Sequence, residues 1–127
     1  MKIQKISALH SDARGNIIAL FDLVNDPDVR SVLVITSEKG AIRANHYHKK
    51  DRHYTYLLSG SFEYTEQVQD KPETKEVYLV KPGDMVQTDP PILHAMRFLE
   101  ASVMVVLTTE DRAPEAYERD TVRVTLI

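Results

Sequence analysis

Short segments typical of β-strands recur along this chain, and turn residues separate them at close intervals. Examples are SVLVIT at 31–36, HYTYLLS at 53–59 and SFEYTEQV at 61–68, with Gly60 between the last two. β-Branched and aromatic residues favour strands, whereas glycine, proline and asparagine interrupt them. About ten such segments predict an all-β fold, either a sandwich or a closed barrel.

The local features of these segments differ. The run 31–36 is apolar without alternation, which is typical of a strand buried on both faces. The run IIALF at 17–21 follows a Gly-Asn turn and is also strand-like, and only 113–119 is expected to be helical. Further strands are expected over 42–48, 75–80, 85–88, 94–98, 102–108 and 121–127.

Composition excludes several classes of function. The chain has no cysteine, so it has neither disulfides nor thiol chemistry. A net charge of -3 provides no basic surface for nucleic acid. No stretch approaches the roughly 20 apolar residues of a membrane span. We expect one domain over residues 1–127, in the cytoplasm, with no nucleic-acid or membrane partner.

Histidine is the most informative residue type, because four of the five histidines lie in two short segments. His46 and His48 are two residues apart on an expected strand, so they point to the same face, about 6–7 Å apart. His53 begins the next strand, and His94 comes from a distant one. We expect all four imidazoles to meet at one site inside the barrel.

Two kinds of chemistry fit such a site. An all-imidazole set suits Zn²⁺, Ni²⁺, Fe²⁺ or Cu²⁺ better than Mg²⁺ or Ca²⁺, so these histidines are candidate ligands of a divalent transition metal. Alternatively, no metal is bound, and imidazoles that titrate near neutral pH transfer protons. The candidate metal ligands are His46, His48, His53 and His94.

The spacing of these residues resembles the two motifs of the cupin superfamily. The first motif spans 40–60, from Gly40 through the histidines to Gly60, and the family usually has Glu where this chain has His53. The second spans 82–98, with Pro-Gly-Asp at its start and His94 within it. The resemblance implies a double-stranded β-helix, the RmlC-like jelly-roll barrel. Cupins host many activities, so the motifs indicate a fold rather than a reaction.

A narrower resemblance links the chain to the nucleotide-sugar 3,4-ketoisomerases within that superfamily. It is carried by RANHYHKK at 43–50, LLSGSF at 57–62 and YERDTVR at 117–123. The resemblance implies that His46 and His48 act as the acid/base pair on a keto-sugar attached to a thymidine nucleotide. It also implies that Arg43 contacts phosphate and that no metal is needed. Ala44 stands where those enzymes have glycine.

We therefore expect a metal-binding cupin that is an isomerase or epimerase with histidine acid/base chemistry, acting on a sugar or nucleotide sugar in a deoxysugar or surface-polysaccharide pathway. One alternative is a metal-dependent cupin oxygenase or lyase that acts on another small molecule. A second is a non-enzymatic barrel that binds or senses a small molecule. The resemblance to small cupins also implies a homodimer.

The sequence also predicts the orientation or structural role of several other residues. The period of two places Ile42, Ala44, His46 and His48 on one face of their strand. It turns Tyr54 and Tyr56 away from the histidines. Methionine and phenylalanine in the later strands are expected to fill the barrel wall, the charged connection 49–52 to be a surface turn, and Asp120 to pair with Arg123. The wall residues are Met85, Met96 and Phe98.

Overall fold

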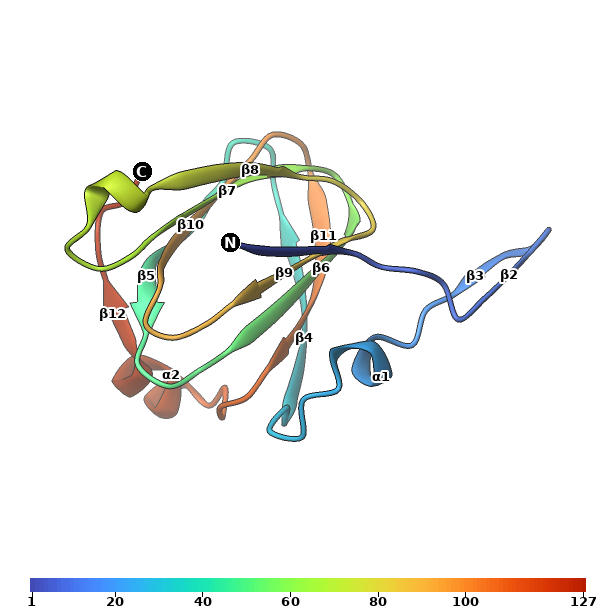
Figure 1. Ribbon diagram of the computed structural model, residues 1–127, viewed down its shortest axis with the longest axis horizontal. Helices are drawn as coiled ribbons and strands as arrows, with labels where there is room; N and C mark the ends of the chain where they lie inside the picture. The colour runs from blue at the N-terminus through green and yellow to red at the C-terminus, as the bar shows by residue number, and fades with distance from the viewer.

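The computed structural model describes all residues, 1–127, and confirms the all-β fold. Two five-stranded antiparallel sheets face each other, with strand orders β1-β9-β6-β11-β4 and β12-β5-β10-β7-β8 (Figure 1). This arrangement is the double-stranded β-helix expected from the sequence. The strands are β1 (Lys2–Lys5), β2 (His10–Asp12), β3 (Gly15–Ile17), β4 (Ser31–Ser37), β5 (Ile42–His48), β6 (His53–Ser59), β7 (Phe62–Gln67), β8 (Glu76–Val80), β9 (Asp84–Thr88), β10 (Leu93–Phe98), β11 (Ser102–Thr108) and β12 (Thr121–Arg123).

The helices are short. The expected C-terminal helix is confirmed as α2 (Pro114–Asp120), and a 3-10 turn, η1, covers Pro72–Thr74. The strand expected over 17–21 is wrong, because β3 ends at Ile17 and α1 (Leu20–Val24) follows. Tertiary packing decides this segment, since Leu20 and Val24 pack against a buried group on the first sheet. None of the helices has the length and apolar character needed to cross a membrane.

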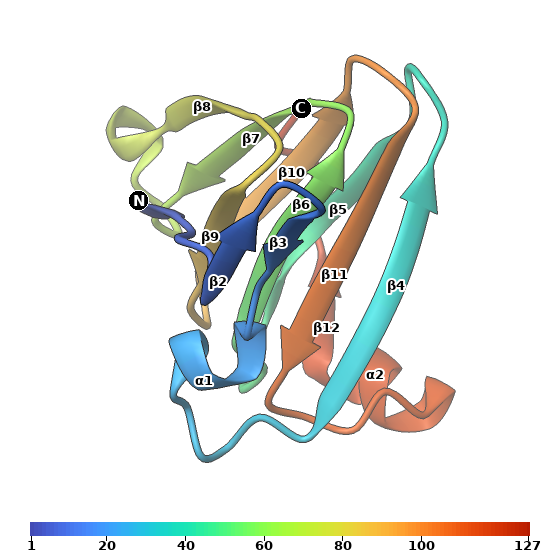
Figure 2. The ribbon, with the colours of Figure 1, turned by 90° about the vertical axis from the view of Figure 1, so that its right-hand side faces the viewer.

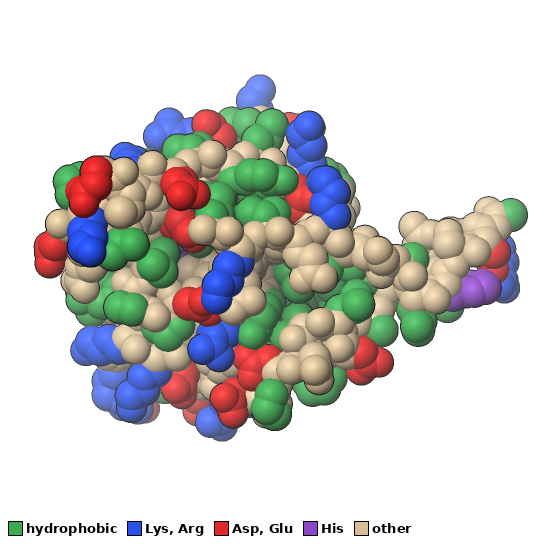
Figure 3. Space-filling view, in the orientation of Figure 1, with side chains coloured by type: hydrophobic (Ala, Val, Ile, Leu, Met, Phe, Trp, Pro, Cys, Tyr) green, Lys and Arg blue, Asp and Glu red, His purple; other side chains and the backbone are tan.

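Strands β2 and β3 form a hairpin that projects from the body of the molecule as an arm (Figure 3). All six of its strand residues are exposed. Neither strand is hydrogen-bonded to either of the large sheets.

Strand β4 lies at the edge of the first sheet, beside β11 (Figure 2). The expectation that this strand is buried on both faces is wrong. Val32 and Val34 are 62% and 71% exposed, whereas Leu33 and Ile35 turn inward. The sequence cannot distinguish the two faces because both are apolar, and only the packing shows which one is covered.

A β-bulge interrupts β5 next to the histidines. Across to β10, His46 pairs with His94 and Ala44 pairs with Ala95, so Asn45 is the extra residue. Ala44 and Asn45 adopt left-handed conformations, with φ of 67° and 55°. An extra residue reverses the alternation of side chains beyond it.

The bulge corrects the expected face of β5. Ile42 is turned outward and is 48% exposed, whereas Arg43 lines the interior cavity together with Ala44 and His46. The assignment of Ile42 to the face of the histidines is therefore wrong, because the alternation of side chains does not continue through the bulge.

The side chain of Asn45 also anchors the end of the chain. Its Oδ1 accepts the backbone N–H groups of Leu126 and Ile127 at 3.1 Å. The final strand is therefore shorter than expected, since β12 ends at Arg123 and the following residues are tied to the bulge instead.

The apolar core lies between the sheets, and a second group lies on the outer face of the first sheet. Tyr54 and Tyr56 belong to the outer group, with Met85 and Leu107, so their expected orientation away from the histidines is confirmed. Met85 and Phe98 are buried, as expected of wall residues. The inner core consists of Leu57, Phe62, Tyr64, Val80, Val86, Met96, Phe98, Met104 and Val106.

Candidate functional site

A cavity of about 140 Å³ opens between the two sheets at the histidines. It is smaller than the roughly 300–1,000 Å³ of pockets that enclose drug-sized ligands. Its inner wall is apolar and shares Met96, Met104 and Val106 with the core, while polar side chains converge from other strands. The lining residues are Leu33, Ile35, Arg43, Ala44, His46, His53, Thr55, His94, Met96, Met104, Val106, Arg112 and Tyr117.

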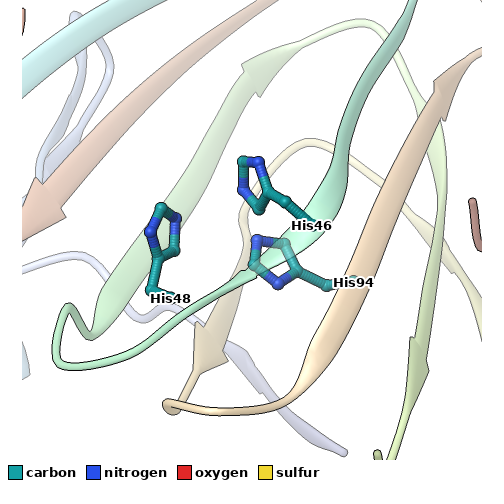
Figure 4. A group of neighbouring side chains, drawn as sticks. All are labelled: His46, His48 and His94. Carbon is teal, nitrogen blue, oxygen red and sulfur yellow. The ribbon is translucent and has the colours of Figure 1, made fainter. Parts of the chain in front are cut away.

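Three of the four predicted histidines form one compact group. Nitrogen atoms of His46, His48 and His94 lie within 4.8 Å of one another, and their rings surround a common space (Figure 4). The ring centroids of His46 lie 4.5 Å from His48 and 4.6 Å from His94. All three residues are at least nine-tenths buried. The first two share β5, and His94 faces His46 directly from β10.

The Nδ1 atoms of His48 and His94 have partners. His94 Nδ1 lies 3.1 Å from the carbonyl of Ile92, to which it donates. His48 Nδ1 lies 3.3 Å from both Asp120 Oδ2 and the hydroxyl of Thr121. With Nδ1 protonated, each ring keeps a lone pair on Nε2. His48 Nε2 is buried and has no hydrogen-bond partner. Such an orphaned acceptor beside other imidazoles fits a metal ion or a proton-donating ligand.

Burial makes these imidazoles weak bases. It lowers the pKa of His46 to about 4 and that of His48 to about 3, and it lowers the pKa of His94 well below its usual value. Nearby charge at His53 adds to the effect at His46 and His48. At neutral pH the three rings are therefore uncharged and have lone pairs available.

His53 lies beside this group rather than within it. Its ring centroid is 4.6 Å from that of His48 and 6.3 Å from that of His94. Its Nε2 is 2.7 Å from Oδ2 of Asp51. A second possible ligand group consists of His48, Asp51 and His53, with donor atoms within 4.8 Å of one another.

The sequence reasoning missed Asp51, which was expected in an exposed turn. It is 2% exposed, and its Oδ1 accepts the backbone N–H groups of Thr109 and Glu110 at 3.0 and 3.2 Å. Burial opposes ionisation, but the hydrogen bond and the charge of His53 outweigh it and lower the pKa of Asp51. An acidic residue two positions before a candidate histidine was the available signal.

Arg112 and Tyr117 were also missed as cavity residues. The guanidinium carbon of Arg112 lies 4.4 Å from the centroid of the Tyr117 ring, a cation–π contact. Arg112 Nη1 also lies 3.4 Å from Asp51 Oδ2 and 3.3 Å from His53 Nε2. Both residues follow β11, and only the return of the C-terminal segment over the barrel brings them to the site.

Arg43 lines the cavity at the bulge. Its Nε donates to the hydroxyl of Ser37 at 2.8 Å, and Nη2 donates to the carbonyl of Thr36 at 2.9 Å. These bonds hold the guanidinium against the end of β4. Met96, which was expected only to fill the wall, also lines this cavity.

The expected pair between Asp120 and Arg123 is wrong. Arg123 forms two hydrogen bonds with Glu118, at 2.9 and 2.8 Å. Asp120 instead accepts the backbone N–H groups of Lys50 and Asp51 and lies against His48. Strand β12 begins directly after Asp120, and its first residue, Thr121, pairs with His48 at the end of β5. The carboxylate of Asp120 therefore lies at the end of β5 and does not contact Arg123 farther along β12.

Comparison with known protein families agrees with this architecture. The family model described as Cupin domain matches residues 33–110, which is more than half of the 127 residues. No curated protein gives a significant match to the sequence.

Several solved structures share the fold. The QdtA 3,4-ketoisomerase from Thermoanaerobacterium thermosaccharolyticum, a double mutant in complex with TDP, has a TM-score of 0.77 and 25% identity, covering 96% of this chain and 86% of its own. A 3,4-ketoisomerase from Helicobacter canadensis has a TM-score of 0.78 and 21% identity, covering 96% and 89%. The rmlC epimerase of Mycobacterium tuberculosis has a TM-score of 0.71 and 18% identity, covering 90% and 65%. The RmlC-like jelly-roll fold is thereby confirmed.

Proposed function

The chain belongs to the cupin family, and from that premise we propose that it is an isomerase or epimerase acting on a sugar or nucleotide sugar. We place the reaction in a deoxysugar or surface-polysaccharide pathway. The observation that carries the proposal is the group of uncharged imidazoles at the cavity between the two sheets. QdtA, a structural neighbour, was solved with TDP and with TDP-4-keto-6-deoxyglucose.

The chemistry of such a reaction suits these side chains. Moving a carbonyl to the neighbouring carbon requires removal of one proton beside the keto group and delivery of another. An uncharged imidazole accepts a proton on its lone pair, and an imidazolium returns it. In the mechanism implied by the ketoisomerase resemblance, His46 and His48 share this work. His46 lines the cavity directly, and His48 packs behind it.

Arg43 is the proposed contact for the phosphates of the substrate. Arginine offers a planar set of donors that matches phosphate oxygens, and the bulge turns this side chain into the cavity wall. Its bonds to Ser37 and Thr36 hold the guanidinium in place before ligand arrives.

The test is incubation with TDP-4-keto-6-deoxyglucose in deuterium oxide, followed by NMR. We expect deuterium at the carbon beside the keto group and a product with the carbonyl moved by one position. His46→Gln should abolish exchange, whereas His10→Gln, on the exposed arm, should leave it unchanged. Absence of exchange with several 4-keto sugars would contradict the proposal.

A metal-dependent reaction is the second candidate function, such as that of a cupin oxygenase or lyase. The observation that favours it is the orphaned Nε2 of buried His48, which faces two further uncharged imidazoles. His46, His48 and His94 would hold a divalent transition metal, namely Zn²⁺, Ni²⁺, Fe²⁺ or Cu²⁺. His53 lies beside this set, with its Nε2 against Asp51. When bound, such an ion polarises a carbonyl or activates water.

We also propose that the protein is a homodimer. The outward face of β4 presents Val32 and Val34 to solvent at an edge of the first sheet that has no neighbouring strand. An exposed apolar edge strand is a site of association that monomeric proteins avoid.

A further inference from the structure

The two histidines most accessible from the cavity are His46 and His53. His48 is less accessible. The lining residues include His46 and His53 but not His48. The side chain of His53 is 12% exposed, whereas that of His48 is 2% exposed. A substrate in this cavity therefore contacts His53, and His48 lies behind the wall.

The ring of His53 is positioned by the carboxylate of Asp51, which backbone hydrogen bonds fix in turn. Its Nε2 lies 2.7 Å from Asp51 Oδ2, and that carboxylate accepts two backbone N–H groups from the segment after β11. A carboxylate that accepts from one ring nitrogen selects the tautomer protonated there. Arg112 Nη1 also approaches this nitrogen, but at 3.3 Å its contact is longer than the 2.7 Å contact with Asp51. His53 thus carries its proton on Nε2, and its Nδ1 has the free lone pair.

We infer that His53, positioned by Asp51, is the catalytic base that exchanges the carbon-bound proton of the substrate, with His46 as its partner at the substrate oxygens. This inference rests on the proposed isomerase function. The carboxylate stabilises the imidazolium formed when the ring takes up a proton, as in other Asp–His pairs. His46 lines the same cavity but has no carboxylate partner, so it suits hydrogen bonding to oxygen.

The proposed step balances without any added reagent. Nδ1 of His53 takes the proton from the hydroxyl-bearing carbon beside the carbonyl. The electron pair of that C–H bond forms a C=C bond, and the former carbonyl oxygen receives a proton through His46 to give an enediol. His53 then returns its proton to the former carbonyl carbon. The hydroxyl proton of the first carbon leaves through His46, so that carbon becomes the new carbonyl.

The experiment compares wild-type protein with His53→Gln, Asp51→Asn and Asp51→Glu in the TDP-4-keto-6-deoxyglucose exchange assay, with kcat and KM determined separately. We expect His53→Gln to lower kcat by about 100-fold or more, the usual contribution of a general base, with KM changed by less than about threefold. Asp51→Asn should lower kcat by a similar factor, because the amide favours the wrong tautomer. Asp51→Glu should restore part of the loss.

Controls separate catalysis from folding. His10→Gln, on the projecting arm, should match wild type. Thermal unfolding of each variant should remain cooperative, and added imidazole should restore part of the exchange to His53→Ala but not to His46→Ala. Wild-type kcat in His53→Gln would overturn the inference, as would a loss confined to KM.

A second readout does not depend on the reaction. NMR of nitrogen-labelled protein should show His53 protonated at Nε2 and unprotonated at Nδ1, and Asp51→Asn should change this pattern while His10 keeps its signals. If the wild type exchanges no keto-sugar, the proposed function fails, and this spectrum still decides whether Asp51 positions His53. A proton on Nδ1 in the wild type would overturn the pairing.

Discussion

His46 and His94 lie directly opposite each other on adjacent strands, and their ring centroids are 4.6 Å apart. The backbone register of β5 and β10 sets this distance, so the two imidazoles are positioned before any ligand binds. The bulge begins one residue before His46, so it redirects Arg43 without disturbing the pair. A site built on paired strands is more rigid than one built on loops.

Metal content provides the first prediction. Under the metal-dependent candidate function, wild-type protein purifies with a divalent transition metal, and His94→Ala should lower the affinity for that metal by at least about tenfold, because one of three nitrogen donors is lost. Elemental analysis after gel filtration measures the content, with His10→Ala as the matched control. A wild-type protein that neither contains nor binds such a metal would exclude this site.

Two substitutions at the bulge are expected to change the free energy of unfolding in opposite directions. Ala44→Gly is expected to stabilise the protein by about 0.5–1 kcal/mol, because relief of the left-handed strain at φ 67° exceeds the added entropy of the unfolded chain. Ala95→Gly, at the paired position in ordinary buried strand, should destabilise it by about 1 kcal/mol. Urea denaturation measures both, and equal signs would contradict the role assigned to the bulge.

Gly60, between β6 and β7, is expected to tolerate no side chain. A Cβ there would lie 2.5 Å from the carbonyl oxygen of Ala101 and would also clash with Ser102, in addition to the strain at φ 90°. Gly60→Ala should therefore cost more than about 3 kcal/mol. Gly40→Ala, at φ 85° but with open space around it, should cost only about 1–2 kcal/mol. Similar losses in chemical denaturation would refute the steric explanation.

The hydrogen bond from Tyr54 to Asp26 predicts a dependence of stability on pH. The hydroxyl donates to Oδ2 at 2.6 Å and lowers the pKa of Asp26, while burial and this bond raise the pKa of Tyr54 to about 12. The contribution of Asp26 is present above its unfolded pKa and is lost as pH falls through the lower folded pKa. That of Tyr54 is present below about 10, its ordinary pKa, and is lost as pH rises through 12.

Tyr54→Phe tests this dependence. The variant should be less stable than wild type by about 1 kcal/mol at pH 7. The difference should narrow at acid pH, where Asp26 is protonated, and also at strongly alkaline pH. Urea denaturation across the pH range measures it, and a difference that stays constant from pH 7 to the acid limit would show that the carboxylate is not involved.

The exposed edge provides a test of assembly. Val34→Glu should convert the proposed homodimer into a monomer without unfolding it, because Val34 is 71% exposed and contributes nothing to the core. Val77→Glu is the matched control, since Val77 is 57% exposed on β8, the edge strand of the other sheet. Light scattering coupled to gel filtration measures the mass. A monomeric wild type, or loss of the dimer in the control, would contradict the use of β4.

The strand segments between residues 31 and 108, the turns between them and the place of the histidines on them were predictable from the sequence, because strand propensity, glycine turns and motif spacing are local properties. The cupin fold followed from the spacing of Gly40, Gly60 and the histidines. Local patterns also predicted that Tyr54 and Tyr56 point away from the site, since β6 has no bulge within that stretch.

Only the tertiary structure decided which side chains share the cavity. The bulge at Asn45 is defined by the partner strand β10, so the segment 42–48 alone could not show that Arg43 turns inward and Ile42 outward. The burial of Asp51 depends on backbone N–H groups more than fifty residues away, at Thr109 and Glu110. Register and burial depend on contacts between segments that are distant in the sequence, so a local sequence pattern does not determine them.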